Sequence, residues 1–320
     1  MLKFKTTLST ILALVLLSAA SMPAPAQKKA KNDKDKTEKK VYSGTPVLWH
    51  APDDIGSRNL LLGAGGEAMK PDLSRVTFVE VKEGGWSTKY RVRDGSGNEW
   101  VAKLSKEAQP ETAANRLVWA AGYETEIVYL VPELEIQGKG TFKNVKLEAR
   151  PKDVKRTDFW LWDSNPFLGK SEFQGLKIMM ALINNWDMKD DNNAILAVKG
   201  VTDSERRFII SDLGATFGKT GGIFSRSRNK PSDYVKAEFV KGVNGNHINF
   251  NYSGKNQKLF EGITVADAQW LSGWLGRLSD EQIKDAFRAA NYSSDEVDML
   301  AGAFRARVNT LAKLGSGSDR

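Results

Sequence analysis

Two short segments in the second half of the chain carry residues that suit metal-assisted chemistry. The first, NNWDMKDDNN at residues 184–193, places Asp187 five residues before Asn192. The second, FIISDLGATFG at 208–218, places Asp212 directly after an apolar run. Magnesium prefers hard oxygen ligands and keeps several waters, so one carboxylate and one amide oxygen from the protein are a sufficient set. Asp212 and Asn192 are therefore the candidate metal ligands.

Phosphoryl transfer is one chemistry that such a pair of oxygen ligands can serve. Such a reaction asks little covalent chemistry of the protein, because its rate comes from positioning and from cations that neutralise charge on the phosphate oxygens. Asp187 is placed to accept a proton from the attacking hydroxyl or to orient it, and Lys189 is expected near the transferred phosphate. We take Asp187 and Lys189 as candidate catalytic residues and expect Mg²⁺ or Mn²⁺ at Asn192 and Asp212.

The two segments resemble the catalytic skeleton of the protein-kinase-like superfamily. Asp187-Met188-Lys189 with Asn192 is similar to the catalytic loop of Ser/Thr kinases, and the Asp-x-Gly is closest to atypical branches: HipA-like, phosphoinositide-kinase-like and secretory-pathway kinases. Asn185-Trp186 stands where ordinary kinases have His-Arg, and no G-x-G-x-x-G or A-P-E element is present. The resemblance implies an ATP-dependent phosphotransferase, with ATP or another nucleotide as its donor. It also implies a two-lobed α+β fold, with a small β-rich N-lobe that has one main helix and a larger, mostly helical C-lobe.

The first half of the chain contains a candidate for the loop and hairpin that cover the nucleotide in this family, and for the lysine that binds its phosphates. Two strand-like runs, YRVRD and EWVAKL, flank a Gly/Asn turn and predict a β-hairpin. Glycines before the hairpin would let the backbone approach phosphate groups. In the family, a phosphate-binding lysine follows such a hairpin. The residues that we expect to bind the donor here are Gly84, Gly85, Ser87, Lys89 and Lys103.

In the family, a glutamate on the next helix holds this lysine. Pro110 suits the first turn of such a helix and Gly122 suits its end, and the apolar residues between them recur at helical spacing. Glu111 lies near the N-terminus of this helix and is the expected partner of Lys103. Glu107 is the alternative partner, and the sequence leaves that choice open.

Further strands and helices complete the two expected lobes. The strand-like runs EIVYLVPEL and TFKNVKLEARPK would finish the N-lobe sheet, which places the N-lobe at 46–150 and the C-lobe at 151–320. A helix in EFQGLKIMMALI would deliver the catalytic loop, and three helical segments would close the chain. The turn-rich segment GTPVLWHAPDDIGSRNLLLGAGG, before the first hairpin, is expected to be loop.

A basic, Ser-rich run, SRSRNKPSDY, follows the Asp-x-Gly. In the family this region is the activation or substrate-docking segment. Arg226, Arg228 and Lys230 would then attract an acidic substrate, or the run is a mobile surface loop, and both interpretations stay open.

The N-terminus has the pattern of an export signal. Lys3 and Lys5 precede an apolar run at 8–17 and then Ala24-Pro25-Ala26, which predicts a cleavable signal peptide at 1–26. The apolar run is too short for a transmembrane span, and the chain has no cysteine for lipid attachment or disulfides. We therefore expect a secreted or periplasmic protein without a transmembrane anchor after cleavage.

Residues 27–45 are expected to form a disordered, Lys-rich tether. The run 27–40 carries +4 and the signal peptide +2 of the chain's net charge of +8, so the lobes hold only +2. We therefore expect no nucleic-acid partner, and the tether either contacts an anionic surface or serves as a solubilising spacer. The chain has two histidines, which argues against a zinc site or a His-based triad. We expect a monomer that binds a nucleotide and an acceptor of unknown class.

Export leaves the donor and the exact reaction open, because free ATP is scarce outside the bacterial cytoplasm. Another nucleotide donor, a host compartment, nucleotidyl (AMP) transfer on the same fold, or nucleotide binding by a pseudokinase would each fit the site. The retained set of site residues weighs against a pseudokinase, since degenerate sites usually lose one or more of them. A non-catalytic envelope interaction protein is the remaining alternative.

Overall fold

Residues 40–84, 87–200 and 205–315 are described by the structure, a computed structural model. The signal peptide expected at 1–26, residues 27–39 of the predicted tether and Gly85 lie outside the described residues, so what the sequence predicts for them stays a prediction. No helix in the described ranges is long and apolar enough to cross a membrane.

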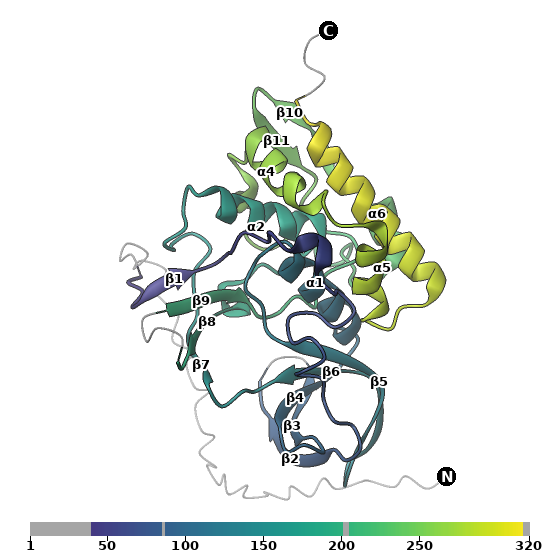
Figure 1. The fold of residues 1–320 in the computed structure, drawn as a ribbon. Coiled ribbons are helices and arrows are strands. Elements are labelled where there is room, and N and C mark those ends of the chain that lie inside the picture. The colour runs from purple at the N-terminus through teal and green to yellow at the C-terminus, as the bar shows by residue number, and fades with distance from the viewer. Residues whose placement is uncertain (1–39, 85–86, 201–204, 316–320) are drawn as a thin grey trace, which may run out of the picture. The chain divides into compact units, whose positions relative to one another are not determined.

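A five-stranded antiparallel sheet forms the smaller lobe, and in Figure 1 its strands curve around one another. Along each strand, alternate residues point into a core that includes Val92, Trp100 and Leu147, as the period of two in a strand requires. The opposite face of the central strands carries the candidate site. In spatial order the strands are β2 (Thr77–Lys82), β3 (Thr88–Arg93), β4 (Glu99–Leu104), β6 (Gly140–Ala149) and β5 (Val128–Ile136).

The predicted hairpin joins β3 to β4 and sets the register of Lys103. The Asp94 carboxylate accepts hydrogen bonds from the backbone N–H of Asn98 (2.8 Å) and from Nε1 of Trp100 (2.9 Å). Gly97 takes a φ of +84°, which glycine adopts without a steric penalty. The turn is therefore held by its own side chains, and the register that it fixes pairs Lys89 of β3 with Lys103 of β4.

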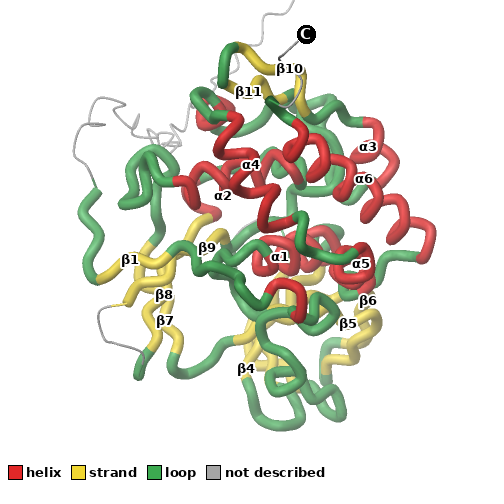
Figure 2. Tube along the Cα trace, turned by 45° about the horizontal axis from the view of Figure 1, so that its top comes forward, coloured by secondary structure: helices red, strands yellow, loops and turns green. Residues whose placement is uncertain are grey.

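Helix α1 (Ala108–Ala120) follows β4 and is the main helix of this lobe. Ala113, Ala114 and Leu117 are fully buried, and the helix packs on β5, β6 and α5. Figure 2 shows α1 between the strands of the five-stranded sheet and the remaining helices. The helix ends before Gly122, whose φ is +94° and where a Cβ would lie 2.3 Å from the carbonyl oxygen of His50. The predicted helix is confirmed, and so is its end near Gly122.

A second sheet includes the strand that directly follows the predicted catalytic loop at 184–192. Its order is β1 (Thr45–Val47), β9 (Glu205–Ile210), β8 (Asn193–Val198) and β7 (Val154–Asp158), with β1 parallel to β9. The expectation of loop before the first hairpin is therefore wrong at β1. At the end of the predicted tether, Lys40 pairs with Asp158 (2.9 Å), and the Tyr42 hydroxyl donates to the Ser164 carbonyl (2.7 Å).

Helices build most of the larger lobe. Helix α2 (Ser171–Leu182) runs into the catalytic loop, and its apolar face is buried as predicted. The N-caps of α4, α5 and α6 are Thr264, Ser279 and Ser293, and each forms a capping box with the third helical residue. The other elements are α3 (Pro231–Lys236), β10 (Val240–Asn244), β11 (His247–Phe250), α4 (Val265–Leu275), α5 (Asp280–Arg288), α6 (Ser294–Lys313) and the 3-10 turns Ile55–Ser57, Asp190–Asn192 and Gln257–Phe260.

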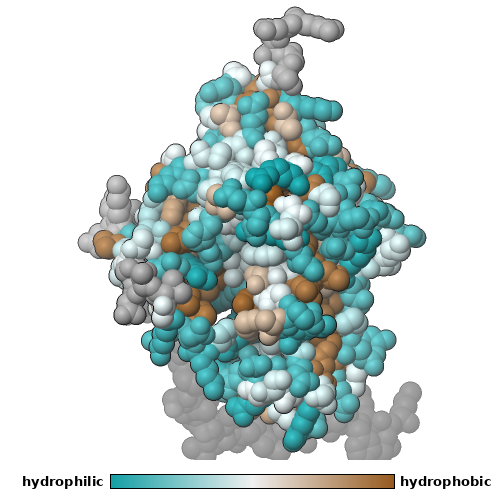
Figure 3. All heavy atoms as spheres, viewed as in Figure 1, coloured by the Kyte–Doolittle hydropathy of each residue, from teal (hydrophilic) through white to brown (hydrophobic). Residues whose placement is uncertain are grey.

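The surface seen in Figure 3 is mostly hydrophilic, with hydrophobic residues in small separate groups. The architecture is α+β, with a β-rich lobe that has one main helix and a lobe dominated by helices, as predicted. In the larger lobe, β1, β7, β8 and the β10–β11 hairpin are strands that the sequence did not predict.

Candidate active site

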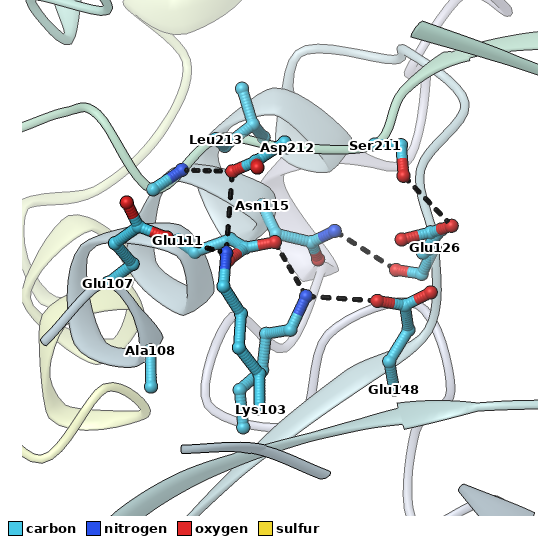
Figure 4. A network of polar contacts seen from close by, with 12 residues as sticks. Lys103, Glu107, Ala108, Glu111, Asn115, Glu126, Glu148, Ser211, Asp212 and Leu213 are labelled. Carbon is cyan, nitrogen blue, oxygen red and sulfur yellow. Dashed lines mark hydrogen bonds and ion pairs between the residues drawn. The ribbon is translucent and has the colours of Figure 1, made fainter. Parts of the chain in front are cut away.

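Lys103, near the end of β4, is the centre of the site. Its ammonium donates to Glu111 Oε2 at 2.7 Å, contacts Glu107 Oε2 at 2.9 Å and reaches Asp212 Oδ1 at 3.5 Å. Figure 4 shows Lys103 between Glu111 and Asp212. Burial works to lower the pKa of Lys103, but Glu111 and Asp212 outweigh it, and the net change is upward. The lysine is therefore charged, and both glutamates that the sequence offered as its partner contact it.

A second buried lysine, Lys146 of β6, shares Glu111 with Lys103. Its ammonium donates to Glu111 Oε1 at 2.6 Å and to Glu148 Oε2 at 3.0 Å. Burial works to lower the pKa of Lys146, whereas Glu111 and Glu148 outweigh burial and raise it. One carboxylate thus lies between two ammonium groups, and Glu148 in turn pairs with Arg150. The sequence analysis did not predict Lys146 or Glu148 as part of the site.

Asp212 and Asn192, the predicted metal ligands, are joined through the backbone, where the Asp212 amide donates to the Asn192 carbonyl at 3.2 Å. Asp212 Oδ1 accepts from Lys103 and from the Gly214 amide at 3.1 Å, and Asn192 donates its Nδ2 to the Asp187 carbonyl at 2.6 Å. Among the described residues, Asp212 Oδ2 and Asn192 Oδ1 have no hydrogen-bond partner. One carboxylate and one amide oxygen therefore fit a magnesium-type cation.

The electrostatics of Asp212 agree with a metal-binding role. Burial works to raise the pKa of Asp212, but Lys103 and the Gly214 amide outweigh it and lower the pKa. The carboxylate is thus ionised, and its side chain is 43% exposed. No group of three or more His, Cys, Asp or Glu side chains suited to a metal occurs in the described part of the chain. The cation would therefore rely on water and on its ligand for the remaining positions.

Asp187 is held in the catalytic loop by short local contacts. Its amide N–H donates to Asn185 Oδ1 at 3.1 Å, its Oδ2 pairs with Lys189 at 2.8 Å, and Asn192 Nδ2 lies 3.5 Å from the same oxygen. Trp186, which stands where ordinary kinases have arginine, donates its Nε1 to the Ser227 carbonyl at 2.9 Å. The loop is therefore tied both to the metal candidates and to the segment after Asp-Leu-Gly.

The loop between β2 and β3 carries the other predicted donor-binding residues. Gly84 has a φ of +100° and nothing within 4 Å of a Cβ placed on it, so the loop backbone is open there. Ser87 donates its Oγ to Glu107 Oε2 at 3.1 Å. Glu107 also lies against the Asp-Leu-Gly segment, because a Cβ on Gly214 would be 2.7 Å from the Cβ of Glu107. Glu107 thus joins this loop, Lys103 and Asp-Leu-Gly.

A cavity of about 400 Å³ lies among these groups. The predicted residues that line it are Lys89, Lys103, Glu111, Asn192 and Asp212. Asp187 and Lys189 do not line it and are linked to it through Asn192. The residues that line it without having been predicted are Val101, Lys146, Glu148, Arg150, Arg156, Asp191 and Ser211. The alternation Lys146-Leu147-Glu148-Ala149-Arg150 was the sequence signal for three of them.

A larger cavity, of about 600 Å³, shares only Arg150 and Arg156 with the first. None of the predicted site residues lines it. We place the chemistry in the smaller cavity, because that is where the lysine, the glutamate and the Asp-Leu-Gly acid converge.

The basic run after Asp-Leu-Gly is largely paired within the chain. Arg228 forms an ion pair with Glu107, and Lys230 lies 3.3 Å from Asp233. Arg226 and Arg228 lie over the ring of Trp186, at 4.1 and 4.8 Å from its centroid. Attraction of an acidic substrate by this run stays a prediction, and two of its three cations already have acidic partners.

No protein-family model matches the chain, and no curated protein matches it. Among solved structures, it is similar to the Helicobacter pylori proinflammatory kinase CtkA, with 11% identity, a TM-score of 0.46, and 76% of this chain and 97% of that chain covered. It is also similar to the Rio2 kinase of Chaetomium thermophilum in its ADP/Mg²⁺-phosphoaspartate complex, with 12% identity and a TM-score of 0.34. The match covers 76% of this chain and 74% of that chain. The chain is also similar to a Golgi casein kinase, with 10% identity and a TM-score of 0.35, and the match covers 81% of this chain and 78% of that chain.

These likenesses are distant, so the assignment of the fold relies on the chain itself. The five-stranded sheet, helix α1 after β4, the Lys103–Glu111 pair and Asp-Leu-Gly after β9 occur in the order along the chain that the resemblance implied. The chain has a protein-kinase-like fold.

Proposed function

We propose that this chain is a metal-dependent phosphotransferase that uses a nucleotide triphosphate as its donor. The observation that carries the proposal is the convergence of a lysine and a glutamate of the smaller lobe with an aspartate from much later in the chain. The ammonium group of Lys103 in β4 lies 2.7 Å from a carboxylate oxygen of Glu111 in α1 and 3.5 Å from a carboxylate oxygen of Asp212 after β9. Asn192 joins them through the backbone of Asp212. A buried lysine beside two free oxygen ligands suits a phosphate chain with its counter-cation.

Each residue has a defined part in the proposed reaction. Asp187 takes the proton of the acceptor hydroxyl as the acceptor oxygen bonds to the terminal phosphorus, the bridging P–O bond breaks, and the nucleoside diphosphate leaves with its electron pair. Lys189 lies 2.8 Å from Asp187, where it orients the carboxylate and reaches toward the transferred group. Lys103, held by Glu111, positions the phosphate chain. A cation bound at Asn192 and Asp212 would neutralise negative charge on the phosphate oxygens.

We also propose that the protein acts after export, because its first residues have the pattern of a signal peptide. The acceptor is a hydroxyl compound that meets the site from the side of Trp186 and the segment after Asp-Leu-Gly. This segment is placed by the Trp186–Ser227 hydrogen bond next to Asp187.

The test is incubation of the purified chain with Mg²⁺ or Mn²⁺ and with ATP labelled at either the γ- or the α-phosphate. Incorporation of γ-label that is lost in Asp187→Ala and in Asp212→Ala, but kept in the surface control Asp53→Ala, supports the proposal. Equal incorporation by wild type and both site variants contradicts it. Incorporation of α-label only would show nucleotidyl transfer instead.

A further inference from the structure

Four lysines lie in direct register across four neighbouring strands of the small lobe. Lys82 of β2 pairs with Lys89 of β3, Lys89 pairs with Lys103 of β4, and Lys103 pairs with Lys146 of β6. Directly paired residues of antiparallel strands present their side chains on the same face, and like charges in such pairs are destabilising. A row of like charges over four strands therefore needs a compensating partner.

The chain supplies partners for only part of this row. Lys103 and Lys146 are buried and share Glu111, whereas Lys82 is 38% exposed and contacts Glu80 at 3.2 Å. Lys89 lines the cavity and has no ion-pair partner among the described residues. The row thus runs from the buried end of the cavity toward solvent over three strand spacings, or about 14 Å. Its outer half can meet a further anion.

The other wall of the cavity is poorly suited to a nucleobase. Base-sized ligands are usually enclosed by apolar and aromatic side chains. Among the described residues that line this cavity, Val101 is the only apolar one. Glu148 lies near the end of β6, Arg150 directly after it and Arg156 within β7; Glu148 pairs with Arg150, and Arg156 donates a hydrogen bond to Glu126. These polar groups lie where the smaller cavity meets the larger one, so the smaller cavity itself offers a base few apolar contacts.

We propose that the site holds its donor through a linear phosphate chain and not through a base, so that inorganic polyphosphate serves as a phosphoryl donor. The proposal relies on the phosphotransferase function proposed above and specifies its donor. In the reaction, the acceptor oxygen bonds to the terminal phosphorus, the adjacent bridging P–O bond breaks, and the shortened polyphosphate leaves with the electron pair. The acceptor proton passes to Asp187. Such a donor also removes the dependence of an exported enzyme on ATP.

The binding test compares linear tripolyphosphate, ATP and adenosine by thermal shift and calorimetry with Mg²⁺ at fixed ionic strength. Tripolyphosphate is expected to bind within about threefold of ATP, and adenosine is expected not to bind. Lys89→Gln should weaken tripolyphosphate binding by about tenfold, since it removes a charge that lines the cavity. Lys143→Gln is the matched control, because Lys143 is an exposed lysine of β6 that does not line the cavity.

The outcomes separate this proposal from the phosphotransferase function. If ATP binds and tripolyphosphate does not, donor recognition through the phosphate chain is wrong while phosphotransferase activity stands. If Lys89→Gln and Lys143→Gln weaken tripolyphosphate equally, the binding is non-specific and the proposal fails. If neither anion binds with Mg²⁺ or Mn²⁺, both proposals fail. Transfer of label from terminally labelled polyphosphate, lost in Asp187→Ala, supports the proposed donor.

Discussion

Glu111→Gln is the substitution that tests the buried charges of the site most directly. The Glu111 carboxylate is only 4% exposed and contacts two lysines that are equally inaccessible, Lys103 at 2.7 Å and Lys146 at 2.6 Å. A glutamine has the same shape but cannot accept hydrogen bonds from both ammonium groups, because its NH₂ group is only a donor. The substitution therefore removes a charge and leaves its two partners in place.

The size of the effect follows from the charges that remain. Two ammonium groups that contact opposite oxygens of one carboxylate lie about 6 Å apart, and at an effective dielectric constant of about 20 they repel by about 3 kcal/mol. In the variant, Lys103 still pairs with Glu107 at 2.9 Å and Lys146 still pairs with Glu148 at 3.0 Å, and these ion pairs limit the loss of stability. Breaking a buried ion pair typically costs about 3–5 kcal/mol. We expect Glu111→Gln to lower the free energy of unfolding by about 3–4 kcal/mol.

Urea unfolding followed by tryptophan fluorescence measures this loss by linear extrapolation. Lys146→Met alone should lower the free energy of unfolding by less, about 1–2 kcal/mol, because Glu111 still pairs with Lys103 and Glu148 still pairs with Arg150. The double variant should lose at least about 2 kcal/mol less than the sum of the single variants. A Glu111→Gln protein within 1 kcal/mol of wild type (about the uncertainty of the extrapolation), or strict additivity in the double variant, would refute the reasoning.

Three other substitutions test particular contacts by the same unfolding measurement. Gly214→Ala should destabilise the protein by about 1–3 kcal/mol, because its Cβ would lie 2.7 Å from the Cβ of Glu107. Gly302→Ala, inside α6 and with nothing within 4 Å of the added Cβ, should instead stabilise it by about 0.5–1 kcal/mol, and a loss there would contradict the argument. Burial and then Glu148 raise the pKa of Glu126 from 4.5 to about 8, so the folded protein binds this proton more tightly and loses stability as pH rises through that range. Glu126→Gln should therefore flatten the decline in unfolding free energy between pH 5 and pH 8, and an unchanged pH slope would contradict that assignment.

Local patterns predicted most of the elements that build the site. The hairpin turn, the helix between Pro110 and Gly122, and the helix that leads to the catalytic loop each had a periodicity or a turn signal of their own. These elements form where they were predicted, and so does the strand that ends before Asp212. Lys103 and Glu111 were proposed as partners because the resemblance implies a glutamate on the helix that follows the lysine, and Glu107 stayed open as the alternative.

The rest of the cavity depends on strand register, which no local pattern fixes. Lys146, Glu148 and Arg150 alternate with Leu147 and Ala149, as in any strand with one solvated face. Only the pairing of Lys146 with Lys103 turns that charged face toward α1 and buries it. The strand β1 was missed for a similar reason, because its three residues gain their pairing from β9, far along the chain.

The choice between Glu107 and Glu111 shows what the structure adds to a resemblance. The sequence posed the two as alternatives, yet they are four residues apart at the start of α1, on the same helix face, and both reach Lys103. They differ in their other contacts: Glu111 is buried between two lysines, whereas Glu107 is 16% exposed and also contacts Ser87 and Arg228. A phosphate that approaches Lys103 can displace the more exposed carboxylate at a smaller loss than the buried one. We therefore expect Glu111 to hold the lysine in place and Glu107 to be the partner that gives way when a phosphate binds.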